Sequence, residues 1–226
     1  MNLNFEGRES DSPFVEMIWR TQSERAGSFI SVAESHWEMV VTNYRGRTTF
    51  TVRGPETKAT LADFPAEAEF FGIVFKLGTF MPHLPVCQLR DRNDITLPEA
   101  TNQSFWLLGA AWQLPDYENA DTFIDQLVRD ELLVRDPVVN AALQGQGNGL
   151  SSRSVQRRFL RATGLTHSTI DQIQRARQAM ELLQNGVSIL DTVDMADYAD
   201  QPHLTRSLKR FAGQTPAQIV RPGQPE

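Results

Sequence analysis

Apolar and polar residues alternate with a period close to two between Phe29 and Leu77, and the apolar positions are rich in β-branched and aromatic side chains. This pattern predicts about five short strands, each with one face turned toward a core. Arg45-Gly46-Arg47 places a glycine where a hairpin needs positive φ, and Gly54-Pro55 ends the next stretch. We therefore expect strands at about residues 28–78, arranged as an antiparallel meander or a small barrel-like domain.

After residue 95 the apolar residues recur at the spacing of a helix. Thr96 and Glu99 have the spacing of a capping box, and Phe105, Leu108 and Trp112 follow at intervals of three to four residues. This predicts a helix over the stretch. Further start signals at Asn119 and at Asp136-Pro137 complete a set of helices that we expect at about residues 97–144.

Gly145-Gln-Gly-Asn-Gly149 places three glycines in five residues, which indicates a turn or hinge. The charge changes at the same point: residues 1–150 contain 12 Lys and Arg against 21 Asp and Glu, whereas residues 151–226 contain 10 against 7. Of the 20 aromatic residues, 17 precede residue 151. An acidic, aromatic-rich part and a basic part predict two domains, at residues 1–145 and 146–226.

Helix start signals recur in the basic part, at Ser151, Thr166, Ser188 and Asp200, and each stretch ends in glycine or a polar turn. We therefore predict an all-α domain. Its long helix after Thr166 carries one apolar stripe that can pack on both neighbours, formed by Ile170, Ile173, Met180 and Leu183.

Basic side chains lie opposite the apolar ones on the first and last of these helices. We expect Val155 and Phe159 to be buried on the first helix, and Leu204, Leu208 and Phe211 on the last. The outward residues are then Arg153, Gln156, Arg157 and Arg161 on the first helix, and Thr205, Arg206, Lys209 and Arg210 on the last.

Two strings in this part carry a family resemblance: LSSRSVQRRFLRATGLT at residues 150–166 and YADQPHLTRSLKRFAGQTPAQI at residues 198–219. Residues 150–221, about a third of the chain, resemble the DNA-binding domain of the AraC/XylS family of bacterial transcription regulators. The resemblance implies two helix-turn-helix units joined by a long helix. It also implies that two recognition helices enter successive major grooves on one face of DNA.

Carried over to this sequence, the recognition helices are residues 152–160 and 201–210. Arginine can contact guanine in a bidentate way and glutamine can do the same to adenine, while hydroxyls and helix N-termini hold phosphate. The resemblance therefore implies that the DNA-binding residues are Ser152, Arg153, Gln156, Arg157 and Arg161 on the first helix and Gln201, His203, Thr205, Arg206, Lys209 and Arg210 on the second.

Two positions depart from the family's pattern. In the family's pattern a small residue usually occupies the position of Val193, and a glycine usually occupies the position of Asp197, four residues later. Aspartate tolerates the left-handed conformation better than most residues, so we expect the turn to form, although the carboxylate adds negative charge near the phosphates. The four aspartates of residues 191–200 and the short helix at residues 138–143 predict reduced DNA affinity rather than its loss.

Other basic residues of these helices have a plainer interpretation. Arg158, Arg175 and Arg177 are expected to be solvated and to pair with nearby acids such as Asp171 and Glu181.

For residues 1–145 the resemblance implies a domain that senses a small molecule or holds a dimer together. Aromatic residues alternate on the predicted strands and are candidates to line an effector pocket, with a plain hydrophobic core as the alternative. These candidates are Trp37, Tyr44, Phe50, Phe71 and Phe75.

Composition excludes several classes of protein. The chain has 226 residues and one cysteine, Cys87, so an intramolecular disulfide is impossible. Its longest strongly apolar run, Phe70–Phe75, is far below the roughly 20 residues that span a bilayer, and the sequence begins without a basic-then-apolar leader. We expect a cytoplasmic protein that has no membrane partner.

We expect neither metal nor cofactor and no enzymatic activity. His83 and Cys87 could be two ligands, but Pro82 and Pro85 prevent a helix that would align them, and no second pair lies nearby. The sequence contains no glycine-rich loop of the dinucleotide- or phosphate-binding type. As a nucleophile, Cys87 would have only His83 or His36 as a base, and no supporting motif accompanies them.

The sequence thus predicts an α+β protein with an antiparallel sheet domain and flanking helices, followed by an all-α tandem helix-turn-helix domain. Its expected function is effector-responsive transcription regulation. Double-stranded DNA is the main expected partner, with a small-molecule effector, RNA polymerase and a second copy of the chain as further partners. The alternative is a protein-interaction or ligand-sequestering module whose DNA-binding helices are degenerate.

Overall fold

The computed structural model describes residues 3–91, 94–146 and 149–221, and it divides into two compact units. The first, here called the sheet unit, comprises the chain up to Gly27, His36–Pro55 and Asp63–Leu165. The second, the helical unit, comprises Ser28–Ser35, Glu56–Ala62 and the chain from Thr166. Gly147 and Asn148 of the predicted hinge, and residues 222–226 of the predicted second domain, lie outside the described residues.

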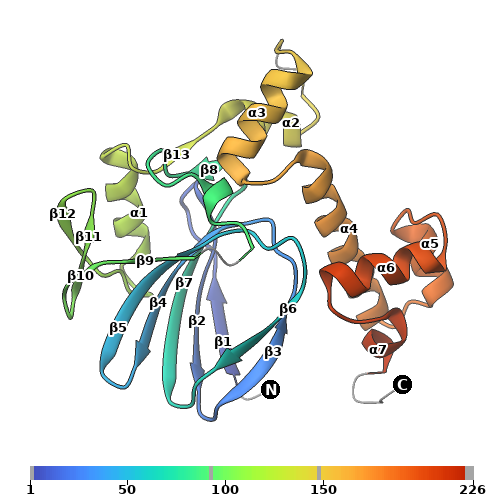
Figure 1. Ribbon diagram of the computed structural model, residues 1–226, viewed down its shortest axis with the longest axis horizontal. Helices are drawn as coiled ribbons and strands as arrows, with labels where there is room; N and C mark the ends of the chain where they lie inside the picture. The colour runs from blue at the N-terminus through green and yellow to red at the C-terminus, as the bar shows by residue number, and fades with distance from the viewer. Residues whose placement is uncertain (1–2, 92–93, 147–148, 222–226) are drawn as a thin grey trace. The chain divides into compact units, whose positions relative to one another are not determined.

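The sheet unit is built on a six-stranded antiparallel sheet of order β1-β2-β7-β4-β5-β9 (Figure 1). The turn between β4 and β5 is the predicted hairpin, with Arg45 and Gly46 at φ 51° and 74°. Because β7 lies between β2 and β4, the strands do not follow one another as in a simple meander. The strands are β1 (Leu3–Arg8), β2 (Val15–Ser23), β4 (Glu38–Tyr44), β5 (Arg47–Arg53), β7 (Ala68–Phe75) and β9 (Ile95–Leu97).

The core of the sheet unit lies on one face of this sheet. Val41, Phe50 and Phe71 are aligned across β4, β5 and β7 and therefore point to the same side. Phe50 meets Phe105 and Phe123 edge to face, with ring centroids 4.6 and 6.1 Å away. Phe123 lies on α1 (Ala120–Arg129), so this helix covers that face.

The helix predicted over Phe105, Leu108 and Trp112 is wrong. The stretch forms a three-stranded antiparallel sheet instead, in which Leu108 and Gly109 make a tight turn with φ 50° and 82°. Phe105, Leu107 and Trp112 are buried while Leu108 is 56% exposed, so the apolar residues also alternate with a period of two. The strands are β10 (Glu99–Thr101), β11 (Ser104–Leu107) and β12 (Ala110–Gln113).

The other predicted helices of the sheet unit are present. Helix α1 begins after Asn119, and the Asp136 carboxylate caps α2 (Pro137–Leu143) by accepting from the Val138 and Val139 amides. Ser151 caps α3 (Ser152–Thr163). The unit also contains the short elements β8 (Thr79–Phe80), η1 (Val86–Gln88) and β13 (Val134–Arg135).

The helical unit holds the remaining helices and most of two strands from earlier in the chain. Thr166, Ser188 and Asp200 cap their helices as predicted, each accepting a backbone amide on its side chain, and Thr215 adds a capping box. The elements are β3 (Gly27–Ser31), β6 (Thr60–Phe64), α4 (His167–Gln184), α5 (Ile189–Met195), α6 (Gln201–Phe211) and α7 (Pro216–Val220).

The long helix α4 packs as its apolar stripe predicts. Ile170, Ile173 and Leu183 are buried, together with Ala176 and Ala179. The predicted fold class, an antiparallel sheet region followed by a helical region, is thereby confirmed. Among the described residues, no helix is long and apolar enough to cross a membrane.

Candidate DNA-binding surface

Helix α6 is oriented by its apolar side. Leu204, Leu208 and Phe211 are all at most 5% exposed, and Asp200 caps the first turn by accepting the His203 amide at 2.6 Å. Helix and cap together leave one side of α6 facing solvent.

The predicted DNA-binding residues of α6 lie on or beside that solvent-facing side. Gln201, Arg206, Lys209 and Arg210 are exposed, and His203 and Thr205 are half-buried. The Thr205 hydroxyl donates to the Gln201 carbonyl of its own helix at 2.9 Å. Within the described chain, Arg206, Lys209 and Arg210 form no ion pair. Their guanidinium and ammonium groups are therefore available to a polyanion.

A groove of about 360 Å³ runs between α4 and this side of α6. Arg175 of α4 donates to the Asp197 carbonyl at 3.3 Å, and the Tyr198 and Ser207 hydroxyls are 2.8 Å apart. Burial raises the pKa of the Tyr198 phenol despite the Ser207 hydrogen bond and the charge of Arg175, so the phenol stays neutral near pH 7. The groove is lined by Ser168, Asp171, Gln172, Arg175, Tyr198, His203, Arg206, Ser207, Arg210 and Phe211.

The composition of this groove suits an anion. It contains three arginines, whereas its one carboxylate, Asp171, lies 3.2 Å from the His167 ring. Hydroxyl groups and arginines are the side chains that hold phosphate. Sequence reasoning missed Tyr198 and Ser207 and assigned Arg175 to the solvated surface, because only the packing of α4 against α6 brings them together.

The turn between α5 and α6 forms as predicted. Asp197 has φ 54°, in the left-handed region, and the Tyr198 amide donates to the Val193 carbonyl at 2.9 Å. Val193 is 8% exposed, so the larger residue is accommodated inside the unit.

Helix α3 exposes the predicted DNA-binding residues of the first helix-turn-helix unit. Phe159, Ala162 and Thr163 are buried, while Val155 is only half-buried. Arg161 lies over the Phe80 ring with its guanidinium carbon 5.5 Å from the ring centroid. Ser152, Arg153, Gln156, Arg157 and Arg161 are all exposed.

The arginines interpreted as structural do pair, but not with the acids that sequence proximity suggested. Arg158 lies 3.2 Å from Asp136, the residue that caps α2, and Arg177 pairs with Glu34. Arg175 bonds a carbonyl and lies over the Tyr198 ring. Folding brings Arg158 and Arg177 next to acidic residues that are distant in sequence. No local sequence pattern indicates such pairs.

The five aromatic candidates for an effector pocket are not brought together. Trp37 and Phe75 stack at 4.0 Å inside the core, and the Trp37 indole donates to the Thr79 carbonyl at 2.7 Å. Phe50 lies in the cluster under α1. Phe71, Tyr44 and Phe50 do line cavities, but three different ones.

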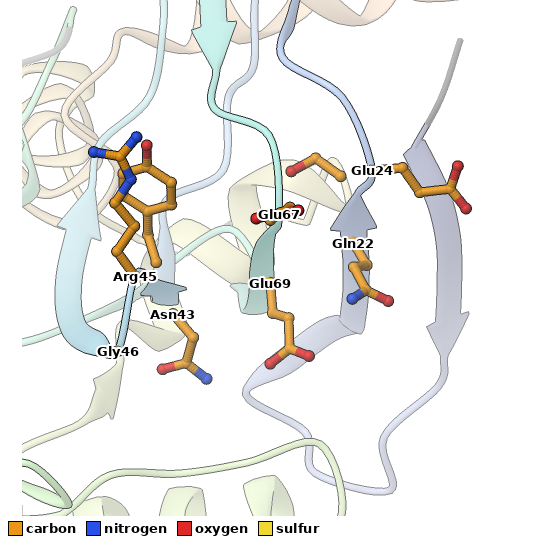
Figure 2. Close-up of a pocket in the computed structure, with 9 residues that line it drawn as sticks. Gln22, Glu24, Asn43, Arg45, Gly46, Glu67 and Glu69 are labelled. Carbon is orange, nitrogen blue, oxygen red and sulfur yellow. The ribbon is translucent and has the colours of Figure 1, made fainter.

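The cavities lined by Tyr44 and Phe71 are adjacent, since Gln22, Asn43 and Glu69 line both. Figure 2 shows these three side chains extending to the same side of the sheet from neighbouring strands, as their alignment requires. The cavity with Tyr44 and Arg45 measures about 440 Å³, and the one with Phe71 about 370 Å³. The three polar residues were not predicted, because only strand pairing places them side by side.

No group of three His, Cys, Asp or Glu side chains in the described chain is placed to hold a metal ion. Cys87 is an exposed free thiol.

Comparison with known proteins identifies the C-terminal region. A family model described as "Helix-turn-helix domain" matches residues 146–221. The HTH-type transcriptional regulator RipA of Corynebacterium glutamicum is 33% identical over 89 residues, which make up 38% of this chain and 27% of that protein. RipA of Corynebacterium diphtheriae is 34% identical over 77 residues, which make up 34% of this chain and 23% of that protein.

The match therefore spans about a quarter of the length of these relatives. A solved structure, ToxT from Vibrio cholerae O395, aligns over 96% of both chains with a TM-score of 0.39 and 7% identity. The family match covers the capped helices α3 to α7. Residues 146–221 are thus similar to a helix-turn-helix domain.

Proposed function

We propose that this protein is a DNA-binding transcription regulator that reads DNA with the exposed faces of α3 and α6. The observation that carries the proposal is the outer side of α6. There Arg206, Lys209 and Arg210 form no ion pair within the described chain while the opposite side of the helix is buried. Similarity to two HTH-type transcriptional regulators supports it.

The candidate DNA-binding residues differ in whether their chemistry suits bases or phosphates. Arg153 and Arg206 can each offer a bidentate fork to guanine, and Gln156 and Gln201 can do the same to adenine. Lys209 and Arg210, in the last turn of α6, supply point charges for phosphate. Arg175 would join them through the groove beside α6.

The test is selection of genomic DNA fragments by the purified protein at near-physiological salt. We expect the native protein to enrich a short motif and the Arg153→Ala/Arg206→Ala variant to lose the enrichment. Arg25→Ala/Arg129→Ala is the matched control, because it removes the same charge from exposed positions outside the two helices. If the native protein enriches nothing even at low salt, the helices serve as an interaction module instead.

We further propose that the sheet unit senses a small molecule. The two adjacent cavities support this, because they combine the apolar Phe71 with the amides of Gln22 and Asn43. Native mass spectrometry of protein purified from a bacterial host should detect a retained small molecule. An Asn43→Leu variant should retain less of it, whereas Asn102→Leu, the same substitution at an exposed position outside both cavities, should retain the same amount. Equal retention by both variants would place the ligand elsewhere.

A further inference from the structure

The helical unit contains two segments from far earlier in the chain, residues 28–35 and 56–62, here called the ribbon. Their strands β3 and β6 pair with each other, and Glu34 and Glu56 exchange backbone hydrogen bonds of 3.0 and 2.8 Å. The Glu56 carboxylate also accepts the Ser31 and Thr60 hydroxyls at 3.2 and 3.3 Å. The ribbon is therefore one hydrogen-bonded element rather than two separate loops.

Two backbone amides of the ribbon donate to the C-terminal end of α6. The Ala33 amide donates to the Phe211 carbonyl and the Ala59 amide to the Arg210 carbonyl, both at 2.7 Å. The last four carbonyls of a helix have no partner within it. Ala33 and Phe211 are 1% and 5% exposed, so an unpaired carbonyl there would have little access to water. The ribbon thus satisfies two carbonyls of the last turn of α6.

The ribbon also contacts both neighbours of this turn. Glu34 forms an ion pair with Arg177 of α4, and both side chains are half-buried. Beyond α6, Gly213 has φ 70°, and a Cβ atom there would lie 2.9 Å from Ile30 and 3.1 Å from Ala59. The chain leaving α6 therefore passes closely against the ribbon.

We propose that the ribbon is a working part of the second helix-turn-helix unit. It holds the last turn of α6, which carries Lys209 and Arg210, in the conformation that binds phosphate. It also makes that conformation depend on the sheet strands. The covalent path is short, since β3 joins β2 to β4 and β6 joins β5 to β7. This inference rests on the proposed role of α6 in DNA binding, and Ala33, Glu34 and Ala59 act as positioning residues.

The first test replaces Ala59 with proline, which has no amide proton. DNA binding should weaken about tenfold, and the salt dependence of log K should become less steep by about one to two, because Lys209 and Arg210 no longer hold phosphates. Ala59→Ser keeps the donor and should bind like the native protein. A global loss of folded protein would lower the bound amount without changing the slope. Unchanged affinity and slope in Ala59→Pro, while the native protein binds, would overturn the proposal.

The second test exchanges the charges of the ion pair between Glu34 and Arg177. Glu34→Arg and Arg177→Glu should each weaken DNA binding about threefold, and the double exchange should restore it. A double exchange that binds more weakly than either single variant would show that this pair does not position α6.

The third test needs no DNA and therefore separates this inference from the proposed function. Hydrogen exchange of the Phe211 and Ala212 amides should be faster in full-length Ala59→Pro than in Ala59→Ser, because the last turn of α6 frays. If native protein binds no DNA but exchange responds as stated, the proposed function fails and the structural role of the ribbon stands. Equal exchange in the two variants would refute that role.

Discussion

The two proposed recognition helices are built alike but supported differently. Helices α3 and α6 each follow a seven-residue helix, and each is capped by a side chain on its first turn. Five residues separate α5 from α6, close to the three or four of a tight helix-turn-helix, whereas eight separate α2 from α3. The helix-turn-helix unit of α5 and α6 therefore has the regular geometry, and the unit of α2 and α3 has a longer connection.

Their apolar sides differ as well. Leu204, Leu208 and Phe211 of α6 are all buried, while Val155 of α3, which like Leu204 lies four residues after the capping residue, is only half-buried. Helix α6 also has a C-terminal cap from the ribbon. A similar motif is therefore packed more completely in one place than in the other. We therefore expect α6 to contribute more to sequence specificity than α3, and the following predictions test that difference.

The largest effect is expected from the core under α6. Leu208→Ala should destabilise the helical unit by about 2–5 kcal/mol, because Leu208 is fully buried and its truncation leaves a cavity. Val155→Ala, on the apolar side of α3, should cost about 1 kcal/mol, because this side chain is only half-buried. Thermal and urea unfolding measure both. Equal losses would mean that the two helices are supported equally well.

Next comes base recognition. Arg206→Ala should weaken binding to the selected DNA motif by about 1–3 kcal/mol and relax specificity at one base position. Arg153→Ala should have a smaller effect on the same motif, since α3 is less firmly held. Binding titrations on the motif and on single-base variants distinguish these outcomes. If the Arg206→Ala loss is uniform across sequences, that residue contacts phosphate, and a larger loss from Arg153→Ala would reverse the ranking.

A smaller gain is expected at the turn before α6. Asp197 has φ 54°, which glycine adopts without strain, so Asp197→Gly should stabilise the helical unit by up to about 1 kcal/mol. Removing the carboxylate should also raise affinity for nonspecific DNA. Asp197→Asn separates the two effects, because it removes the charge but keeps a side chain. Lower stability in Asp197→Gly would contradict the strain argument.

The smallest effect concerns pH. Burial raises the pKa of Tyr198 in the folded chain above the usual value of about 10, so the unfolded chain loses this proton first. The stabilisation is therefore fully present below pH 10 and is lost as pH rises through the folded pKa. Unfolding between pH 8 and 11 should show this decline in the native protein and a weaker one in Tyr198→Phe. Identical curves would exclude a contribution from Tyr198.

Prediction from sequence succeeded where the signal is local. Asp136, Ser151, Thr166, Ser188 and Asp200 all cap helices as expected, because a capping side chain bonds an amide two or three residues away. It failed between residues 97 and 112, where Phe105, Leu108 and Trp112 fit a helical spacing. Strand pairing decided that stretch, and Leu108 turned outward.

The candidate site divides in the same way. The outward residues of α6 were predictable, since the opposite apolar stripe must be buried. The partners of Arg158 and Arg177 were not, because Asp136 and Glu34 are distant in sequence. Nor could the alternation of Trp37 and Phe50 distinguish a pocket from a core, since both place aromatic side chains on one face of a sheet.

By itself the sequence determined the four helices α3 to α6, their caps and the basic faces of α3 and α6, because these depend on contacts within one or two turns. Only the tertiary structure decided that β7 lies between β2 and β4, and that Gln22, Asn43 and Glu69 share two cavities. It also decided that the ribbon caps α6. Backbone amides and carbonyls are the same in every residue, so a hydrogen bond between Ala59 and Arg210 leaves no signature in either stretch of sequence.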